Sequence, residues 1–159
     1  MRLILCVSLF VVLGCSSTIQ PSKTIKKEEI VFNTISKGTL FGNGIEGILE
    51  EKFTIKNEKQ WQVFLNKINS VNNVSLSFTE TNINFSNHII ICVFDAIRNT
   101  GGYAIEIKRV FVEKNNLNIV YTKKGPGPME MVTTAITQPY HIVKIEKRGE
   151  DHKFINKNQ

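Results

Sequence analysis

The sequence predicts an α+β fold, in which a mainly antiparallel β-sheet or sandwich of roughly eight strands is accompanied by one amphipathic helix. Two observations support this prediction. From residue 29 onward, short segments rich in β-branched and aromatic residues alternate apolar with polar positions, which is typical of half-buried strands. A single segment instead carries its apolar residues at helical spacing.

The first strand is expected over residues 30–35, which are β-branched and aromatic. Phe53 and Ile55 alternate with polar neighbours and indicate a second strand, half buried. Between the two strands, glycines mark a flexible connection: Gly38, Gly42, Gly44 and Gly47.

The helix is expected to begin after Asn57, whose side chain is a suitable N-cap. Its apolar stripe, about three turns long, is spaced to pack on a sheet. The stripe consists of Trp61, Phe64, Leu65 and Ile68.

After the helix, alternation predicts strands at residues 74–78 and 83–85. Residues 88–97 are apolar at successive positions, as in a central strand covered on both faces. Cys92 lies inside this run and is interpreted as a small buried residue, since no basic neighbour would lower its pKa.

In the next strand, Tyr103, Ile105, Ile107 and Phe111 share one parity. Asn115-Asn116 is a candidate hairpin turn into a strand that places Leu117, Ile119 and Tyr121 on one face. Because proline removes ladder donors, residues 125–128 should end that strand. The last two strands are expected near residues 131–136 and 140–145.

The beginning of the chain has the features of a secretory signal. A short positive region precedes an apolar run over residues 3–13, which is too short to cross a hydrocarbon core about 30 Å thick. The run ends in Val12-Leu13-Gly14-Cys15, which resembles a bacterial lipobox. This resemblance implies a signal peptide over residues 1–14 and an acylated Cys15, carrying chains such as palmitate, that anchors the protein in membrane lipid.

The remaining chain divides into three parts. Residues 15–28 comprise the lipidated Cys15 and a polar, flexible tether; residues 29–147 form a single globular domain; and residues 148–159 are a polar tail that we expect to be frayed. The predicted location is the bacterial cell envelope, with the anchor on the periplasmic side or at the outer membrane or cell surface.

Composition narrows the possible partners. The formal net charge is +6, but the lysines are scattered and the chain is expected to be exported, so we expect no nucleic-acid partner. Cys6 would leave with the signal and Cys15 would be lipidated, so Cys92 would be the only cysteine left. The mature chain could then form no intramolecular disulfide.

Catalytic motifs are missing from the sequence. It contains three histidines and neither an H-E-x-x-H nor a G-x-S-x-G pattern. Asp95 lies in the central strand with Arg98 three residues later, and we interpret this pair as an ion pair or loop anchor. The sequence therefore predicts a non-catalytic binding domain, with no cofactor and no metal.

Two segments rich in glycine or proline, residues 98–103 and 125–131, are the candidate contact surfaces. In the first, Gly101 and Gly102 permit positive φ between two strands; in the second, rigid prolines precede flexible methionines. Two aromatic residues, Tyr103 and Tyr140, are interpreted first as structural side chains that cap strands. The candidate partner-binding residues are Thr100, Gly101, Gly102, Tyr103, Gly125, Pro126, Gly127, Pro128, Met129, Pro139 and Tyr140.

Three segments together resemble one family. Thr100-Gly101-Gly102-Tyr103-Ala104-Ile105-Glu106-Ile107, Gly125-Pro126-Gly127 and Thr137-Gln138-Pro139-Tyr140-His141-Ile142-Val143-Lys144-Ile145 are similar, in order and spacing, to the C-terminal domain of PrcB-type protease complex subunits. The resemblance covers residues 83–147 well and residues 29–82 loosely. It implies an accessory or stabilising subunit of an extracytoplasmic protease complex, with an envelope protease or its subunits as partner. Met129-Glu130-Met131 departs from the family pattern.

Two alternatives remain open at this point. The segment Asn99-Thr100-Gly101-Gly102-Tyr103, with Gln138-Pro139-Tyr140, is faintly similar to the loops of chagasin-like cysteine protease inhibitors, which are β-sandwiches. The other alternative is a structural envelope lipoprotein without a dedicated partner.

Overall fold

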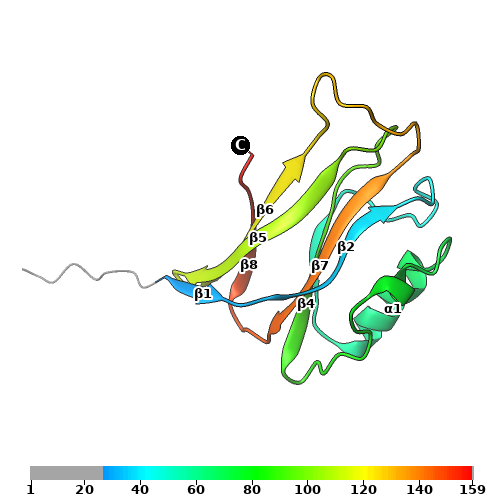
Figure 1. Cartoon of the computed structure of the whole chain (residues 1–159). Coiled ribbons are helices and arrows are strands. Elements are labelled where there is room, and N and C mark those ends of the chain that lie inside the picture. The colour runs from blue at the N-terminus through cyan, green and yellow to red at the C-terminus, as the bar shows by residue number, and fades with distance from the viewer. Residues whose placement is uncertain (1–26, 159) are drawn as a thin grey trace, which may run out of the picture.

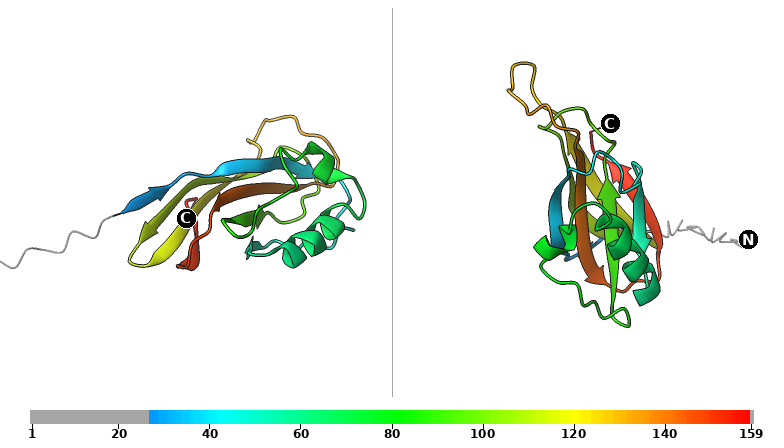
Figure 2. Two further views of the ribbon diagram at one scale, coloured as in Figure 1. Left: turned by 90° about the horizontal axis from the view of Figure 1, so that it is seen from below. Right: turned by 90° about the vertical axis from the view of Figure 1, so that its right-hand side faces the viewer.

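The computed structural model describes residues 27–158, which form two four-stranded sheets and a helix on the outer face of one sheet (Figures 1 and 2). One sheet has the order β1 (Glu28–Ile30), β5 (Ala104–Glu113), β6 (Asn116–Lys124), β8 (Asp151–Asn156). The other has the order β2 (Asn33–Leu40), β7 (Gln138–Glu146), β4 (His88–Phe94), β3 (Lys52–Ile55). The helices are α1 (Glu58–Ile68) and the 3₁₀ helix η1 (Val74–Ser77).

All strand pairs are antiparallel except β6 with β8, so the predicted α+β fold with a mainly antiparallel sandwich is confirmed. No helix among the described residues is long and apolar enough to cross a membrane.

Strand β4 supplies side chains to both hydrophobic cores. Ile89, Ile91 and Val93 pack between the two sheets. The alternate residues Ile90, Cys92 and Phe94 pack toward α1. Since β4 lies between β7 and β3, the prediction of a central strand covered on both faces is confirmed, and the buried thiol of Cys92 has a raised pKa because burial disfavours the thiolate.

The helix α1 forms where its cap and its apolar stripe predict it. The Asn57 side chain accepts a hydrogen bond from the Gln60 amide at 2.9 Å, which satisfies one of the free N–H groups of the first turn. Trp61, Phe64 and Ile68 are buried against the sheet. The indole Nε1 of Trp61 donates to the carbonyl of Thr81 at 2.7 Å, so this large side chain is buried with its polar atom bonded.

Three predicted strands are wrong. Residues 74–77 form η1, because the Asn69 side chain bonds both the amide and the hydroxyl of Ser75 and draws the chain into a tight turn. Leu76 is 84% exposed, so its alternation with serine does not reflect burial. Residues 83–85 and 131–136 lie in connections without strand pairing.

The predicted first strand, residues 30–35, is divided between the two sheets. Glu28–Ile30 pairs with β5 as β1, and the chain then crosses to the other sheet, where β2 begins at Asn33 and pairs with β7. Alternation alone does not reveal such a crossing, because both halves bury apolar residues.

A β-bulge in β5 reverses the side-chain parity that the sequence predicts. The register shifts between Ile107 and Arg109, so Val110 enters the core between the sheets. Phe111 lies on the other face, where the Lys27 ammonium sits 3.7 Å from its ring centroid. The hairpin turn that follows uses Lys114 and Asn115, both with positive φ, one residue earlier than predicted.

The C-terminal segment is ordered in the sheet and is not a frayed tail. Asp151–Asn156 forms β8, which pairs in parallel with β6 at the edge of the sheet. Phe154 packs against the core between the sheets, and the other side chains of β8 are polar or only partly buried, which suits an edge strand. A single partly buried aromatic in a polar sequence is too weak a pattern to predict a strand.

His141 on β7 joins the two sheets. Its Nδ1 accepts a hydrogen bond from the Ile107 amide at 2.9 Å, beside the bulge in β5, and its Nε2 lies 3.0 Å from the Thr34 hydroxyl. Burial, followed by the nearby charge of Lys37, lowers the pKa of His141 to about 4. A second proton would also have to occupy the nitrogen that already accepts from Ile107, so the neutral ring is the form that fits the fold.

We therefore expect the free energy of unfolding to fall as the pH is lowered from about 6.5 to about 4. Above about pH 6.5, the His141 ring is neutral in both the folded and the unfolded chain, and its contribution to stability is fully present. Between about pH 6.5 and pH 4, the ring is protonated in the unfolded chain but stays neutral in the folded chain, so protonation favours unfolding. The loss from His141 should approach roughly 3 kcal/mol at pH 4.

Urea unfolding at pH 7 and at pH 4.5 measures this loss. Because the pKa of the partly buried His152 is also lowered, His152→Gln serves as the reference background. The double variant His141→Gln, His152→Gln should lose much of the remaining pH dependence. If the free energy of unfolding of the double variant depended on pH as strongly as that of the His152→Gln background, the pH dependence could not be assigned to His141.

Candidate interaction surface at the loop end

Three connections meet at one end of the sandwich, which we call the loop end: residues 41–51, 95–103 and 125–137. The strand register places them together, because Leu40 at the end of β2 lies opposite Gln138 at the start of β7. Phe94 at the end of β4 lies opposite Tyr140, and Ala104 at the start of β5 opposite Lys124. Figure 1 shows the three connections at the opposite end of the molecule from β1.

The two segments singled out from the sequence pack against each other. The amide of Gly101 donates to the carbonyl of Thr133 at 3.0 Å, and the Thr137 hydroxyl donates to the carbonyl of Thr100 at 2.7 Å. Gly102 has φ of +83°, and a Cβ there would lie 2.8 Å from Val132. The paired glycines are therefore needed for close packing of these two loops.

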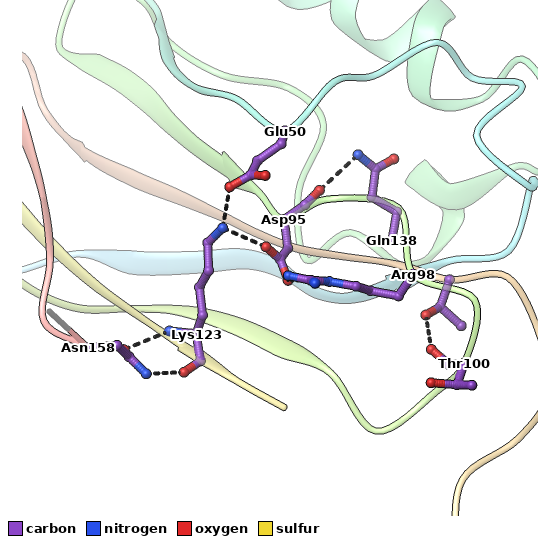
Figure 3. Close-up of polar contacts among 8 residues, drawn as sticks. Glu50, Asp95, Arg98, Thr100, Lys123, Gln138 and Asn158 are labelled. Carbon is purple, nitrogen blue, oxygen red and sulfur yellow. Dashed lines mark hydrogen bonds and ion pairs between the residues drawn. The ribbon is translucent and has the colours of Figure 1, made fainter. Parts of the chain in front are cut away.

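A buried carboxylate lies beneath these loops (Figure 3). Asp95, fully buried, accepts from Arg98 at 2.8 Å and pairs with the Lys123 ammonium at 2.6 Å. Lys123 pairs in turn with Glu50 from the first loop. Burial alone would raise the pKa of Asp95, but the hydrogen bonds from Lys123 and Arg98 outweigh it and hold that pKa below its usual value.

Backbone groups of the same region are bonded by two amide side chains. The Nε2 of Gln138 donates to the carbonyl of Ile48 at 2.9 Å and to the carbonyl of Asp95 at 3.1 Å. Asn158, just after β8, accepts from the amide of Lys123 and donates to its carbonyl. Together with the ion pairs, these contacts connect two of the loops, residues 41–51 and 95–103, to the sheets.

The candidate partner-binding residues fall into an accessible and a buried group. Met129 is 97% exposed, whereas Pro139 and Tyr140 are buried in β7, where the Tyr140 hydroxyl shares a hydrogen bond with Ser36 at 3.0 Å. Tyr103 is half-buried under the Arg98 guanidinium, 4.6 Å from its ring centroid. Pro139 and Tyr140 therefore have no surface for a partner, and Tyr140 has the structural role inferred for it.

Exposed apolar side chains concentrate at the loop end. Sequence reasoning identified Met129 but missed the contribution of residues 41–51, although Phe41, Ile45 and Leu49 stand there among glycines. Four further large exposed apolar residues among those described lie elsewhere, on separate elements. The exposed set at the loop end comprises Phe41, Ile45, Leu49, Ile97, Met129, Met131, Val132 and Ile136.

The histidines do not meet in the described fold. His88 on β4 lies opposite Glu146, whereas His141 on β7 lies opposite Val93 near the other end of β4, so the two rings are far apart along the paired strands. Residues 27–158 contain no group of three or more His, Cys, Asp or Glu side chains arranged to hold a metal. What the loop end offers a partner is an apolar surface on a braced scaffold, which suits protein binding.

The described residues thus form a β-sandwich whose three long connections gather at one end. Residues 89–146 match the family model described as PrcB C-terminal, which confirms the family resemblance inferred from the sequence over this stretch. The match runs from β4 to the end of β7 and includes two of the three loops. No curated protein and no solved structure matches the chain.

Replacing Asp95 with asparagine should lower the free energy of unfolding by roughly 2–4 kcal/mol, because it leaves Lys123 and Arg98 half-buried without their shared partner. Urea unfolding at pH 7 measures the change. The matched control is Glu29→Gln, which removes the exposed ion pair with Arg109 and should have only a small effect. Equal effects of the two substitutions would contradict a bracing role for Asp95.

Proposed function

We propose that this protein is a lipid-anchored, non-catalytic accessory subunit of an extracytoplasmic protease complex, and that it binds its partner through the loop end. The observation that carries the proposal is the concentration of exposed apolar side chains on three loops, two of which are joined by the ion pairs of Asp95 and Lys123 while the third is bonded to residues 100 and 101. Contiguous exposed apolar patches on soluble domains mark interaction sites. The match to the PrcB C-terminal family supports a protease complex as the setting.

The position of β1 suits a tethered binding module. Glu28 pairs with Val112, beside the hairpin turn at Lys114 and Asn115, at the end of the sandwich opposite the loops. An anchor at Cys15 would precede β1 by a segment able to span about 40 Å when extended. The loop end would then point away from the membrane, toward a partner in the envelope.

The methionines add adaptability to this surface. Met129 and Met131 are 97% and 99% exposed, on a loop whose base is pinned by Gly101 and Thr137. Flexible, polarizable thioether side chains adapt their shape to irregular apolar partners. A braced loop with adaptable tips is therefore suited to a stable protein contact.

The inhibitor hypothesis loses one of its two supporting segments. Gln138, Pro139 and Tyr140 are buried within β7, and Gln138 is engaged by backbone carbonyls. They cannot enter the cleft of an enzyme as an inhibitor loop would.

The double substitution Met129→Ser, Met131→Ser should abolish partner capture without reducing stability, because both side chains are exposed. Cross-linking of the full-length protein in its own cells, followed by mass spectrometry, should recover a protease or its subunits with the unaltered chain. The variant should recover them at least tenfold less.

The control is Leu76→Ser, which removes an equally exposed apolar residue on η1, away from the loop end. It should leave capture unchanged. Capture of the same protease by the double variant would place the interface elsewhere, and reproducible capture of no protease at all would reject the proposed function.

Substituting Cys15 with serine tests the anchor separately. Serine provides no thiol for thioether formation, so the variant should lose incorporation of labelled palmitate and leave the membrane fraction. Cys6→Ser is the control, since that residue would be removed with the signal peptide. Membrane retention and labelling of the Cys15 variant would contradict lipidation at this position.

A further inference from the structure

A groove lies between α1 and β3, on the side of the molecule formed by the edge of one sheet. It has a volume of about 400 Å³. Its floor is apolar and comes from Ile48, Phe53, Ile55 and Phe64. The groove borders the loop end through Ile48 and Glu51, and its lining includes neither Met129 nor Met131.

The strand that borders the groove has one open side. β3 pairs with β4 on its inner side, and no other described strand pairs with it. The Phe94 amide donates to the carbonyl of Glu51, which makes these two residues a hydrogen-bonded pair. By the alternation of an antiparallel ladder, the backbone N–H and C=O of Lys52 and Thr54 point away from β4, toward the open side.

The helix presents a matching row of side chains along the groove. Lys59, Val63 and Lys67 are spaced four residues apart on α1, so they lie on one face of the helix, and all three line the groove. Val63 is 62% exposed, so its apolar side chain is accessible on the wall of the groove. The lining contains two lysines and one acidic residue, Glu51.

We propose that this groove binds an extended segment of a partner protein in which an apolar residue is flanked, two positions away on either side, by acidic residues. The segment adds a fifth strand to the sheet beside β3, and its backbone bonds the free groups of Lys52 and Thr54. Residues two positions apart in a strand face the same side, so all three of these side chains point toward α1. The apolar one covers Phe53 and Val63, and the acidic ones pair with Lys59 and Lys67, a charge complementarity that selects an acidic segment over a basic one.

The edge is held ready for such a strand. The Thr54 hydroxyl bonds Nδ1 of His152 on β8 at 3.1 Å, which fixes β3 from the face opposite the groove. The amide of Lys56, where β3 ends, is bonded by the Gln60 side chain at 2.8 Å. The free donors and acceptors are therefore confined to the short stretch that an added strand would cover.

A capped eight-residue peptide with aspartate, valine and aspartate at its third, fifth and seventh positions and threonine at the others, added to the full-length protein in detergent micelles, tests this proposal. Amide hydrogen exchange is followed residue by residue by NMR. The peptide should slow exchange of the Lys52 and Thr54 amides at least tenfold at saturation. The same peptide with lysine in place of both aspartates should bind at least tenfold more weakly.

Val63→Asp is the matched variant, since it places a charge on the exposed groove wall and removes no buried side chain. This substitution should weaken binding of the acidic peptide at least tenfold, whereas Leu76→Asp on η1 should leave its binding unchanged. Equal binding of both peptides, equal binding by both variants, or no slowing at Lys52 and Thr54 would overturn the proposal.

The protein alone distinguishes the other occupants. Slow exchange at Lys52 and Thr54 that grows with protein concentration would assign the groove to a second copy of the chain. Concentration-independent slow exchange that disappears when residues 16–26 are deleted would assign it to the chain's own N-terminal segment. Either result would overturn the assignment to a partner, and neither depends on whether a protease binds the loop end.

Discussion

The Asp95 carboxylate is the contact on which the loop end depends. It is buried at the end of β4, where an unpaired charge would be strongly unfavourable, and it is compensated by Arg98 from its own loop and by Lys123 from β6. Lys123 in turn reaches Glu50 in the connection from β2 to β3. One buried negative charge thus requires three segments, far apart in the sequence, to stay together.

This arrangement also explains why the loops carry both rigid and adaptable residues. Gly101, Gly102 and Thr137 belong to the base, where the loops touch backbone to backbone and a Cβ at Gly102 would not fit. Met129 and Met131 belong to the tips, where nothing restricts their side chains. The family motif therefore coincides mainly with residues that build the loops, and the exposed tips can vary without disturbing the base.

Local patterns predicted the elements whose burial is visible in the sequence. The cap at Asn57 and the stripe of α1 are local, and the apolar run of β4 reflects cover on both faces. The bulge after Ile107 and the strand β8 could not be predicted, because both depend on which strand lies next to them. The same limit applies to the site: Asp95 and Arg98 are three residues apart and were paired from the sequence, but Lys123 and Glu50 reach them only through the fold.

The loop end and the groove beside β3 would bind their partners through different kinds of contact. The loop end offers side chains without free backbone edges, so the shape and adaptability of its partner decide binding. The groove beside β3 offers backbone donors and acceptors, so it accepts many sequences that can extend, with Lys59 and Lys67 favouring acidic ones. Because β3 enters from the connection that contains Glu50, the ion pairs that position the loops also position this edge. A partner bound at the loop end and a strand added at β3 would therefore both rest on the same buried network.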